Sequence, residues 1–297
     1  MVAAENSSSA TDPLKIAENG KENTLPSLDE KHFFRRLGNL YRSWREHRNT
    51  NGWNAVDSFC ILTGRAQPED SGYRKSAIVQ IYLLGYLEFP ETLMIFLPKK
   101  VIVMTGGKKY TMLESVLGGN ETSEIKLELF KRNRKDNKAE NYQQIINALQ
   151  DAGSKVGLLK KEDPKGEFVT SFLSLMEQSN LETFDVSRGI ELALTTKEPD
   201  ELENIRWASA LSSKIYKLKF MEDMELIIDE EKTVSQEKMA NDIEDVFEDP
   251  TKIKVSIDPV DIESCYPPII QSGGKYDLRP SAMSTSEPLK YDVIICS

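Results

Sequence analysis

A chain of 297 residues is about twice the length of a typical single domain, so we expect two domains. Hydrophobic residues make up 39% and charged residues 29% of it, a balance that is typical of globular proteins and excludes collagen-like and wholly disordered chains. The net charge of −10 is concentrated in residues 198–250, which contain sixteen acidic and six basic side chains, and such a segment favours cationic partners over nucleic acid.

The cysteines and histidines limit the available chemistry. Cys60, Cys265 and Cys296 form no CxxC pair, and the start of the chain lacks the basic and apolar segments of a secretory signal, which predicts a reducing compartment. Both histidines, His32 and His47, fall within the first fifty residues. These positions exclude a Cys/His zinc site, and they argue against a hydrolase that needs an imidazole beside its nucleophile. The longest apolar runs are far too short for a transmembrane helix, so no membrane contact is expected.

The first ordered element is predicted to be a helix. Residues 1–28 have no sustained hydrophobic period, and we expect them to form a disordered leader. Asp29 is a good N-cap, and apolar side chains follow it at steps of three and four: Phe33, Phe34, Leu37, Leu40, Tyr41 and Trp44. The spacing alone explains these aromatic residues, so we interpret them as core rather than as a ligand site.

An alternating pattern of short apolar strands and amphipathic helices follows from Ala55. The apolar segments 92–97 and 101–106 are joined at Pro98, Lys99 and Lys100 and predict a hairpin. The other predicted elements, in chain order, lie at residues 55–62, 76–86, 109–117, 125–130, 141–150, 156–160, 166–178 and 183–187. This order predicts an α/β domain with a mixed sheet, which ends between Asp185 and Pro199.

Beyond Pro199 the pattern changes to a long helix and irregular segments. Residues 201–229 predict one helix, and its expected buried face consists of Leu202, Ile205, Leu211, Ile215, Leu218 and Met221. A second helix is predicted at 235–248, and extended strands are expected around Gly273-Gly274. The chain ends on the apolar run YDVIICS without a polar cap, from which we expect a truncated gene product.

No motif in the chain selects a catalytic function. Met104–Gly107 with Lys108 and Lys109 lacks the spacing of a P-loop, and the Gly118-Gly119 and Gly273-Gly274 pairs are most simply turns. The carboxylates of residues 198–250 crowd one helical surface, where a solvated face is the simplest interpretation.

Four segments carry a resemblance to a known family. The longest is CYPPIIQSGGKYDLRPSAMS at residues 265–284, and it is preceded by LYRSW at 40–44, YLLGYLEFPETLMIFLPKKVIVMT at 82–105 and VGLLKKEDPKGEFVTSF at 156–172. Together they closely resemble the N-terminal domain of the large subunit of FACT, a heterodimeric histone chaperone. The resemblance covers about residues 30–297.

The resemblance implies a fold without peptidase activity. It predicts an N-terminal α/β lobe at residues 29–197, with a mixed sheet similar to the N-terminal lobe of creatinase and prolidase. A partial α+β lobe similar to the pita-bread aminopeptidases is expected at 198–297. The peptidase relatives bind two metal ions through Asp, Glu and His side chains of the second lobe, but here no histidine follows His47. We therefore expect no cofactor, no metal and no enzymatic activity.

The resemblance also implies partners and a cellular site. It predicts binding to histones during nucleosome disassembly and reassembly in transcription, replication and repair, in the nucleus and on chromosomes. The smaller HMG-type subunit of FACT is expected to bind only through regions that are missing here. Candidate histone-binding or peptide-binding residues are Gln271, Ser272, Tyr276 and Arg279. The alternative is that these four shape a turn and pack the lobe.

Two other functions stay open at this point. A metal-dependent aminopeptidase or dipeptidase follows from fold analogy alone. A scaffold that docks replication or transcription proteins through the first lobe is the other alternative.

Overall fold

The computed structural model describes residues 28–297 except 51, 66–73, 86–88, 118, 120–122, 133–137 and 280. The expected leader lies outside the described residues apart from Leu28. The fold consists of two compact units, and the boundary between them falls between Lys197 and Glu198. Among the described helices, none combines the length and the apolar composition needed to cross a membrane.

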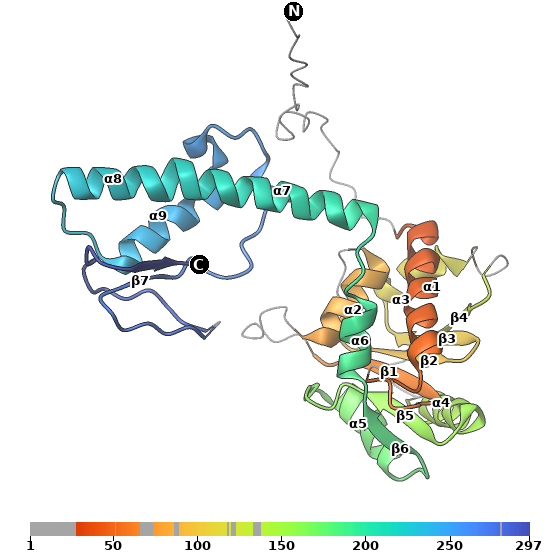
Figure 1. The fold of residues 1–297 in the computed structure, drawn as a ribbon. Coiled ribbons are helices and arrows are strands. Elements are labelled where there is room, and N and C mark those ends of the chain that lie inside the picture. Colours follow the sequence, from red (N-terminus) through yellow and green to blue (C-terminus); the bar gives the residue numbers. More distant parts are fainter. Residues whose placement is uncertain are drawn as a thin grey trace, which may run out of the picture. The chain divides into compact units, whose positions relative to one another are not determined.

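The first unit is built on a six-stranded mixed sheet, which confirms the predicted fold class (Figure 1). Its strand order is β4-β3-β2-β1-β5-β6. The β1–β2 and β2–β3 pairs are antiparallel, and the other three pairs are parallel. The strands are β1 (Ser58–Thr63), β2 (Thr92–Leu97), β3 (Lys100–Thr105), β4 (Lys126–Lys131), β5 (Lys155–Leu158) and β6 (Glu182–Asp185). The predicted hairpin is the β2–β3 pair, whose register aligns Leu97 with Lys100.

Helices cover both faces of this sheet because its strand residues alternate between two cores. Phe59, Ile61 and Phe96 belong to one core, which also takes side chains from α1 (Glu30–His47), α2 (Lys75–Leu84), α3 (Lys108–Glu114) and α6 (Ser187–Ala193). Cys60 and Leu62 belong to the other core, with side chains from α4 (Lys138–Ala152) and α5 (Glu167–Glu177). The same layers can be followed in Figure 1.

Helix α1 forms as predicted and is anchored at both ends. The carboxylate of Asp29 accepts a hydrogen bond of 3.0 Å from the backbone N–H of His32, which satisfies one of the free amides at the helix start. Near its C-terminus, the Tyr41 hydroxyl lies 2.7 Å from the carbonyl oxygen of Leu97 and 2.8 Å from that of Lys100. Burial raises the pKa of this hydroxyl, which keeps it protonated. The helix is therefore held against the turn between β2 and β3.

The sequence patterns miss helix α6. The predicted strand at 183–187 stops at Asp185, whose carboxylate accepts hydrogen bonds from the backbone N–H of Ser187 at 3.1 Å and from its hydroxyl at 2.6 Å. This side-chain turn starts α6, and the apolar side chain of Ile190 is buried in the first core.

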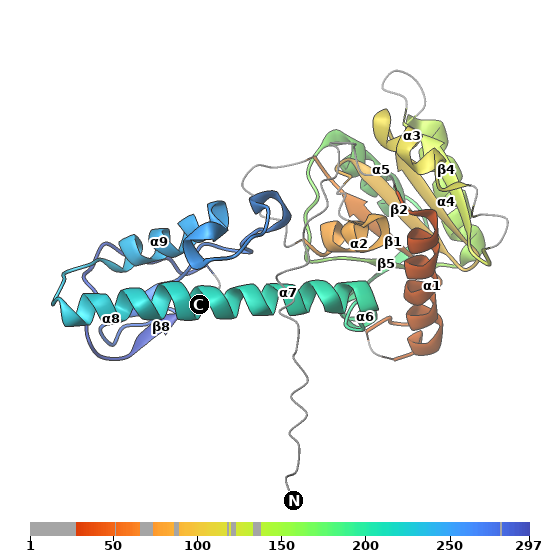
Figure 2. The same ribbon diagram turned by 90° about the horizontal axis from the view of Figure 1, so that it is seen from above.

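The second unit is formed mainly by a long helical rod with a shorter helix beside it (Figure 2). The rod consists of α7 (Pro199–Ile215), a π-helical turn (Tyr216–Met221) and α8 (Glu222–Asp229), and the shorter helix is α9 (Gln236–Glu248). A capping box between Glu198 and Glu201 starts α7. The core of this unit combines Ile215 and Phe220 of the rod with Ile243 of α9 and other apolar side chains.

The buried face predicted for this rod is only partly right. Leu211 and Ile215 are buried, but Leu202, Ile205, Leu218 and Met221 are each at least 37% exposed. The buried side chain that follows Ile215 is Phe220, a step of five residues that matches the i to i+5 hydrogen-bond spacing of a π-helix. The π-helical turn thus rotates the rest of the rod, so Phe220, Met224 and Ile227 replace the residues expected from a regular α-helical period.

The strand pairing in the second unit also differs from the expectation of strands around the Gly-Gly turn. Strand β7 (Ile270–Ser272) ends before Gly273, and it pairs antiparallel with β8 (Ile294–Cys296) at the end of the chain. The pairing extends past β8, because Ile269 and Ser297 exchange two backbone hydrogen bonds of 2.8 and 3.0 Å. The apolar final run is therefore strand-like, as its composition predicts, and it has a partner.

Candidate functional site

The segment 265–284 forms a loop that is closed by the buried side chain of Gln271. The amide of Gln271 donates a hydrogen bond of 2.8 Å to the carbonyl oxygen of Asp277 and accepts one of 2.7 Å from the Asp277 backbone N–H. Gly273 and Gly274, between these residues, have φ angles of 90° and 83°, which side-chain-bearing residues rarely adopt. The two hydrogen bonds of the Gln271 side chain therefore close this tight turn in the same way as the backbone hydrogen bonds of a neighbouring strand would.

Ser272 ties this loop to two other segments of the same unit. Its hydroxyl is buried, accepts a hydrogen bond of 3.0 Å from the backbone N–H of Lys290 and lies 3.4 Å from the side-chain nitrogen of Gln236 on α9. The hydrogen-bonding atoms of Gln271 and Ser272 thus engage their own unit.

Tyr276 and Arg279 stand closer to solvent than the first two candidates. Tyr276 is half-buried, and its hydroxyl donates a hydrogen bond of 2.7 Å to the carbonyl oxygen of Val293. Arg279 is exposed, and its guanidinium binds the carboxylate of Asp277 at 2.6–3.1 Å. The structure brings all four candidate residues into one loop, where two shape the interior and two reach the surface.

The ion pair between Asp277 and Arg279 predicts how this loop responds to pH. The hydrogen bonds from Arg279 lower the pKa of Asp277 to about 2 from its usual 3.8. Because the folded-state pKa is lowered, the pair persists as the pH falls and is lost only when the carboxylate is protonated near pH 2. We expect Arg279→Gln to return the pKa of Asp277 toward 3.8 in an NMR titration. An unchanged pKa in this variant would contradict the ion pair, and Arg206→Gln, which alters an exposed arginine of α7, is the control.

An aromatic pocket opens beside this loop. Its volume is about 670 Å³. Its aromatic walls come from three parts of the second unit, namely the rod, α9 and the loop: Trp207, Tyr216, Phe220, Phe247 and Tyr266. The sequence patterns do not single out these residues, because nothing in the spacing of the rod, α9 and the loop along the chain shows that they line one cavity.

Polar groups also line the aromatic pocket. The residues that line it include Asp261, Glu263, Cys265 and Cys296. The hydroxyls of Tyr266 and Ser297 lie 3.2 Å apart and link the loop to the end of β8. A pocket with apolar walls and carboxylates suits a ligand that has an aliphatic stem and a positive charge, such as a lysine or arginine side chain.

The helices of the second unit add a wide acidic surface. Glu222, Glu225 and Asp229 are exposed on α8, and Glu237 and Glu244 are exposed on α9. Several nearby lysines are paired internally, as in the 2.7 Å contact between Lys219 and Asp223, so they do not offset the remaining carboxylates. This surface attracts cationic segments and repels phosphate groups.

Metal ligands do not converge within this unit. In the described part of residues 198–297, no three Asp, Glu, Cys or His side chains place ligand atoms close enough together to hold one ion. Both histidines of the chain precede residue 48. The described part of the unit therefore presents surface carboxylates rather than a converging set of metal ligands.

The comparisons with known proteins agree with one another. The family model of the FACT complex subunit SPT16 N-terminal lobe domain matches residues 28–189. FACT complex subunit SPT16 of Zea mays is 32% identical over 279 residues, which cover 91% of this chain and 26% of that protein. The Yarrowia lipolytica subunit is 34% identical over 278 residues, with 91% and 27% covered. The chain thus spans about a quarter of the length of these relatives.

Two solved structures extend the likeness to both units. The N-terminal domain of FACT complex subunit SPT16 from Cicer arietinum matches with a TM-score of 0.81 and 33% identity, over 91% of this chain and 63% of that one. The corresponding domain from Eremothecium gossypii matches with a TM-score of 0.71 and 25% identity, over 91% and 64%. These matches confirm the resemblance found in the sequence, and the chain belongs to the family of the FACT complex subunit SPT16.

Proposed function

We propose that this chain is a histone-binding module of a FACT-type histone chaperone, which contributes to nucleosome disassembly and reassembly in transcription, replication and repair. The observation that carries the proposal is the acidic second unit, whose aromatic pocket lies among exposed carboxylates. Membership of the SPT16 family supports a basic chromatin protein as the partner. The proposal places the chain in the nucleus, on chromosomes.

Histone segments are rich in lysine and arginine, and the second unit has the chemistry to hold them. The carboxylates of α8 and α9 would raise the rate of encounter with such a segment. The aliphatic stem of a lysine would pack against Trp207 and Tyr266 while its ammonium group faces Asp261 or Glu263. Contacts of this kind support micromolar rather than nanomolar binding.

The loop of residues 265–284 supports this role in two ways: two of its residues maintain the conformation of the loop, and two others are available for contact with a peptide. We assign Gln271 and Ser272 to holding the loop, since their polar atoms bond within the unit. Tyr276 and Arg279 are placed where a peptide can touch them. Because Asp277 neutralises Arg279, this arginine repels a basic guest less than a free guanidinium would.

The proposal includes the absence of peptidase activity. No histidine follows His47, and a dinuclear peptidase site needs a convergent set of ligands. We expect no turnover of proline-containing dipeptides in the presence of manganese or cobalt. Sustained turnover that depends on the added metal would contradict this part of the proposal and favour the aminopeptidase alternative.

Calorimetry with charge-reversed variants tests histone binding. We expect the full chain to bind histone dimers, tetramers or isolated tails, with an affinity that falls as salt is raised. The triple variant Glu222→Lys, Glu225→Lys, Asp229→Lys reverses three exposed charges of α8 and should weaken binding about tenfold.

The matched control reverses three exposed carboxylates of the first unit: Glu114→Lys, Glu140→Lys and Glu177→Lys. It makes the same change in net charge but leaves the second unit intact, so we expect it to reduce affinity far less. Equal losses in the two triple variants would mean that only net charge matters. Absence of binding to every histone form at low salt would overturn the proposal.

The smaller HMG-type subunit of FACT is not expected to bind this chain. The curated relatives are about four times as long, and we assign that contact to their remaining length. A pull-down with the purified small subunit checks this part of the proposal.

A further inference from the structure

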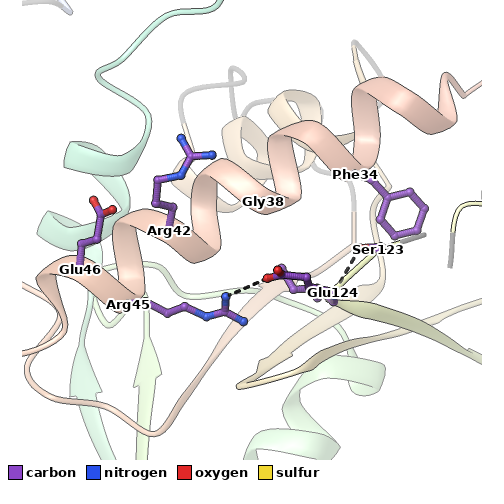
Figure 3. A pocket seen from close by; sticks show the side chains of 8 residues that line it. Phe34, Gly38, Arg42, Arg45, Glu46, Ser123 and Glu124 are labelled. Carbon is purple, nitrogen blue, oxygen red and sulfur yellow. Dashed lines mark hydrogen bonds and ion pairs between the residues drawn. The ribbon is translucent and has the colours of Figure 1, made fainter. Parts of the chain in front are cut away.

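A groove in the first unit lies between α1 and the segment that leads into β4 (Figure 3). Its volume is about 560 Å³. Helix α1 lines it with Phe34, Gly38, Arg42, Arg45 and Glu46, and the opposite wall is formed by Ser123, Glu124 and Ile125. None of these residues belongs to the unit that we propose to bind histones.

Gly38 creates the apolar part of this groove. A Cβ built at Gly38 would meet no atom of the described residues within 4 Å, so among these residues the space above this helical turn is open. Phe34 lies one turn earlier on the same side of α1, and the buried Ile125 lies on the opposite wall. The groove therefore has room for one apolar side chain of a partner.

Basic side chains surround this apolar space. Lys31, Arg35, Arg42 and Arg45 are exposed along the outward side of α1 at steps of three, four and seven residues. Arg45 points across the groove, with its guanidinium 3.7 Å from the carboxylate of Glu124 and 3.1 Å from the carbonyl oxygen of Pro98 (Figure 3).

Arg42 differs from Arg45 because its guanidinium is uncommitted. Within the part of the chain that the structure describes, Arg42 has no ion-pair or hydrogen-bond partner, and Figure 3 shows its side chain extending away from Glu124. A free, exposed guanidinium at the end of a groove can bind a carboxylate through two parallel hydrogen bonds.

We propose that this groove binds an acidic peptide segment of a partner protein, with an apolar side chain seated over Gly38 and a carboxylate on Arg42. Charge complementarity favours this occupant, since four cationic side chains follow α1. The apolar floor disfavours a nucleic-acid backbone, because its phosphates gain nothing from contact with Phe34. The first unit thus takes an acidic ligand, and the second a basic one.

Fluorescence anisotropy with the full chain tests the proposal. The probe is a labelled peptide that alternates aspartate and glutamate around one phenylalanine, and its comparison peptide replaces the phenylalanine by serine. Arg42→Glu should weaken binding of the probe about tenfold, because attraction becomes repulsion. Gly38→Leu should have an effect of similar size by filling the groove, and the Cβ of the new residue has open space around it among the described residues.

The control Arg206→Glu reverses an exposed arginine on α7 and should change the affinity less than about twofold. The serine peptide should bind more weakly than the probe to the original chain, and this difference should vanish in Gly38→Leu. Undiminished binding by Gly38→Leu, or equal losses in Arg42→Glu and Arg206→Glu, would overturn the proposal. Tighter binding of duplex DNA than of the probe, abolished by Arg42→Glu, would overturn it in favour of a nucleic-acid contact.

Discussion

Replacing Phe59 by alanine is expected to lower the free energy of unfolding of the first unit by about 3–5 kcal/mol. The Phe59 ring is fully buried on the central strand β1. Its centroid lies 4.3 Å from that of Phe96, 5.1 Å from that of Trp44 and 5.2 Å from that of Trp53. Neighbouring strands on both sides of β1 prevent the core from closing over the cavity. Urea denaturation followed by tryptophan fluorescence measures this loss.

The measurement separates the two units in a Trp207→Phe background, because Trp44 and Trp53 then report on the first unit alone. The control Ile78→Ala truncates a side chain of α2 that is 40% exposed, and we expect a change within about 0.5 kcal/mol. A loss below about 1 kcal/mol for Phe59→Ala would contradict the packing described for this core.

Replacing Gln271 by alanine is expected to open the loop of residues 265–284. Both hydrogen bonds to the backbone of Asp277 would disappear, and each partly buried group left without a partner costs about 1–3 kcal/mol. The backbone amide of Asp277 should then exchange with deuterium about ten to a hundred times faster. Histone affinity should fall as well, because the turn that positions Tyr276 and Arg279 is no longer held closed by Gln271.

Two variants sharpen the interpretation of this experiment. Gln271→Glu keeps the acceptor for the Asp277 N–H and loses the donor to the Asp277 carbonyl, so exchange at this amide should be intermediate. Gln150→Ala, which removes an exposed side chain of α4, should leave exchange in the loop unchanged. If the amide of Asp277 exchanges equally in Gln271→Ala and the original chain, the loop is not held by Gln271. If exchange quickens but histone affinity stays constant, the loop is not part of the binding surface.

Local sequence signals predict most of the first unit. The Asp29 cap and the three-four spacing of Phe33 through Trp44 predict α1, which spans Glu30–His47. Apolar runs on either side of Pro98-Lys99 predict the β2–β3 hairpin. These signals are reliable because each is a property of neighbouring residues: a cap satisfies the nearest amides, and periodicity fixes which side of a single element is apolar.

The second unit is less predictable because its decisive contacts join distant residues. The π-helical turn of residues 216–221 changes which side of the rod is buried. No single residue in this segment predicts that the helix changes from α-helical to π-helical hydrogen bonding there. In the same way, β7 pairs with β8, about twenty residues further along the chain, although the Gly-Gly turn directly after β7 favours a local hairpin.

For the candidate site, the sequence identifies the loop but not the role of its residues. Gln271 and Ser272 belong to the distinctive segment, yet only their burial and their bonds to Asp277 and Lys290 show that they hold the loop together. The aromatic walls of the pocket come from three parts of the second unit, and the walls of the groove beside Gly38 come from two segments of the first unit. Neither cavity could be predicted from the sequence, because its lining residues form no recognisable pattern along the chain.

The sequence by itself determined the mixed α/β class, the acidic character of residues 198–250, the scarcity of histidine and the likeness to the FACT large-subunit family. All four follow from composition, from short-range periodicity or from runs of matching residues. Only the tertiary structure decided which side of the rod from α7 to α8 is buried, which strand pairs with β7, and which side chains meet in the two cavities. The reason is that side-chain packing depends on distances between residues far apart in the chain, and these distances exist only once the chain is folded.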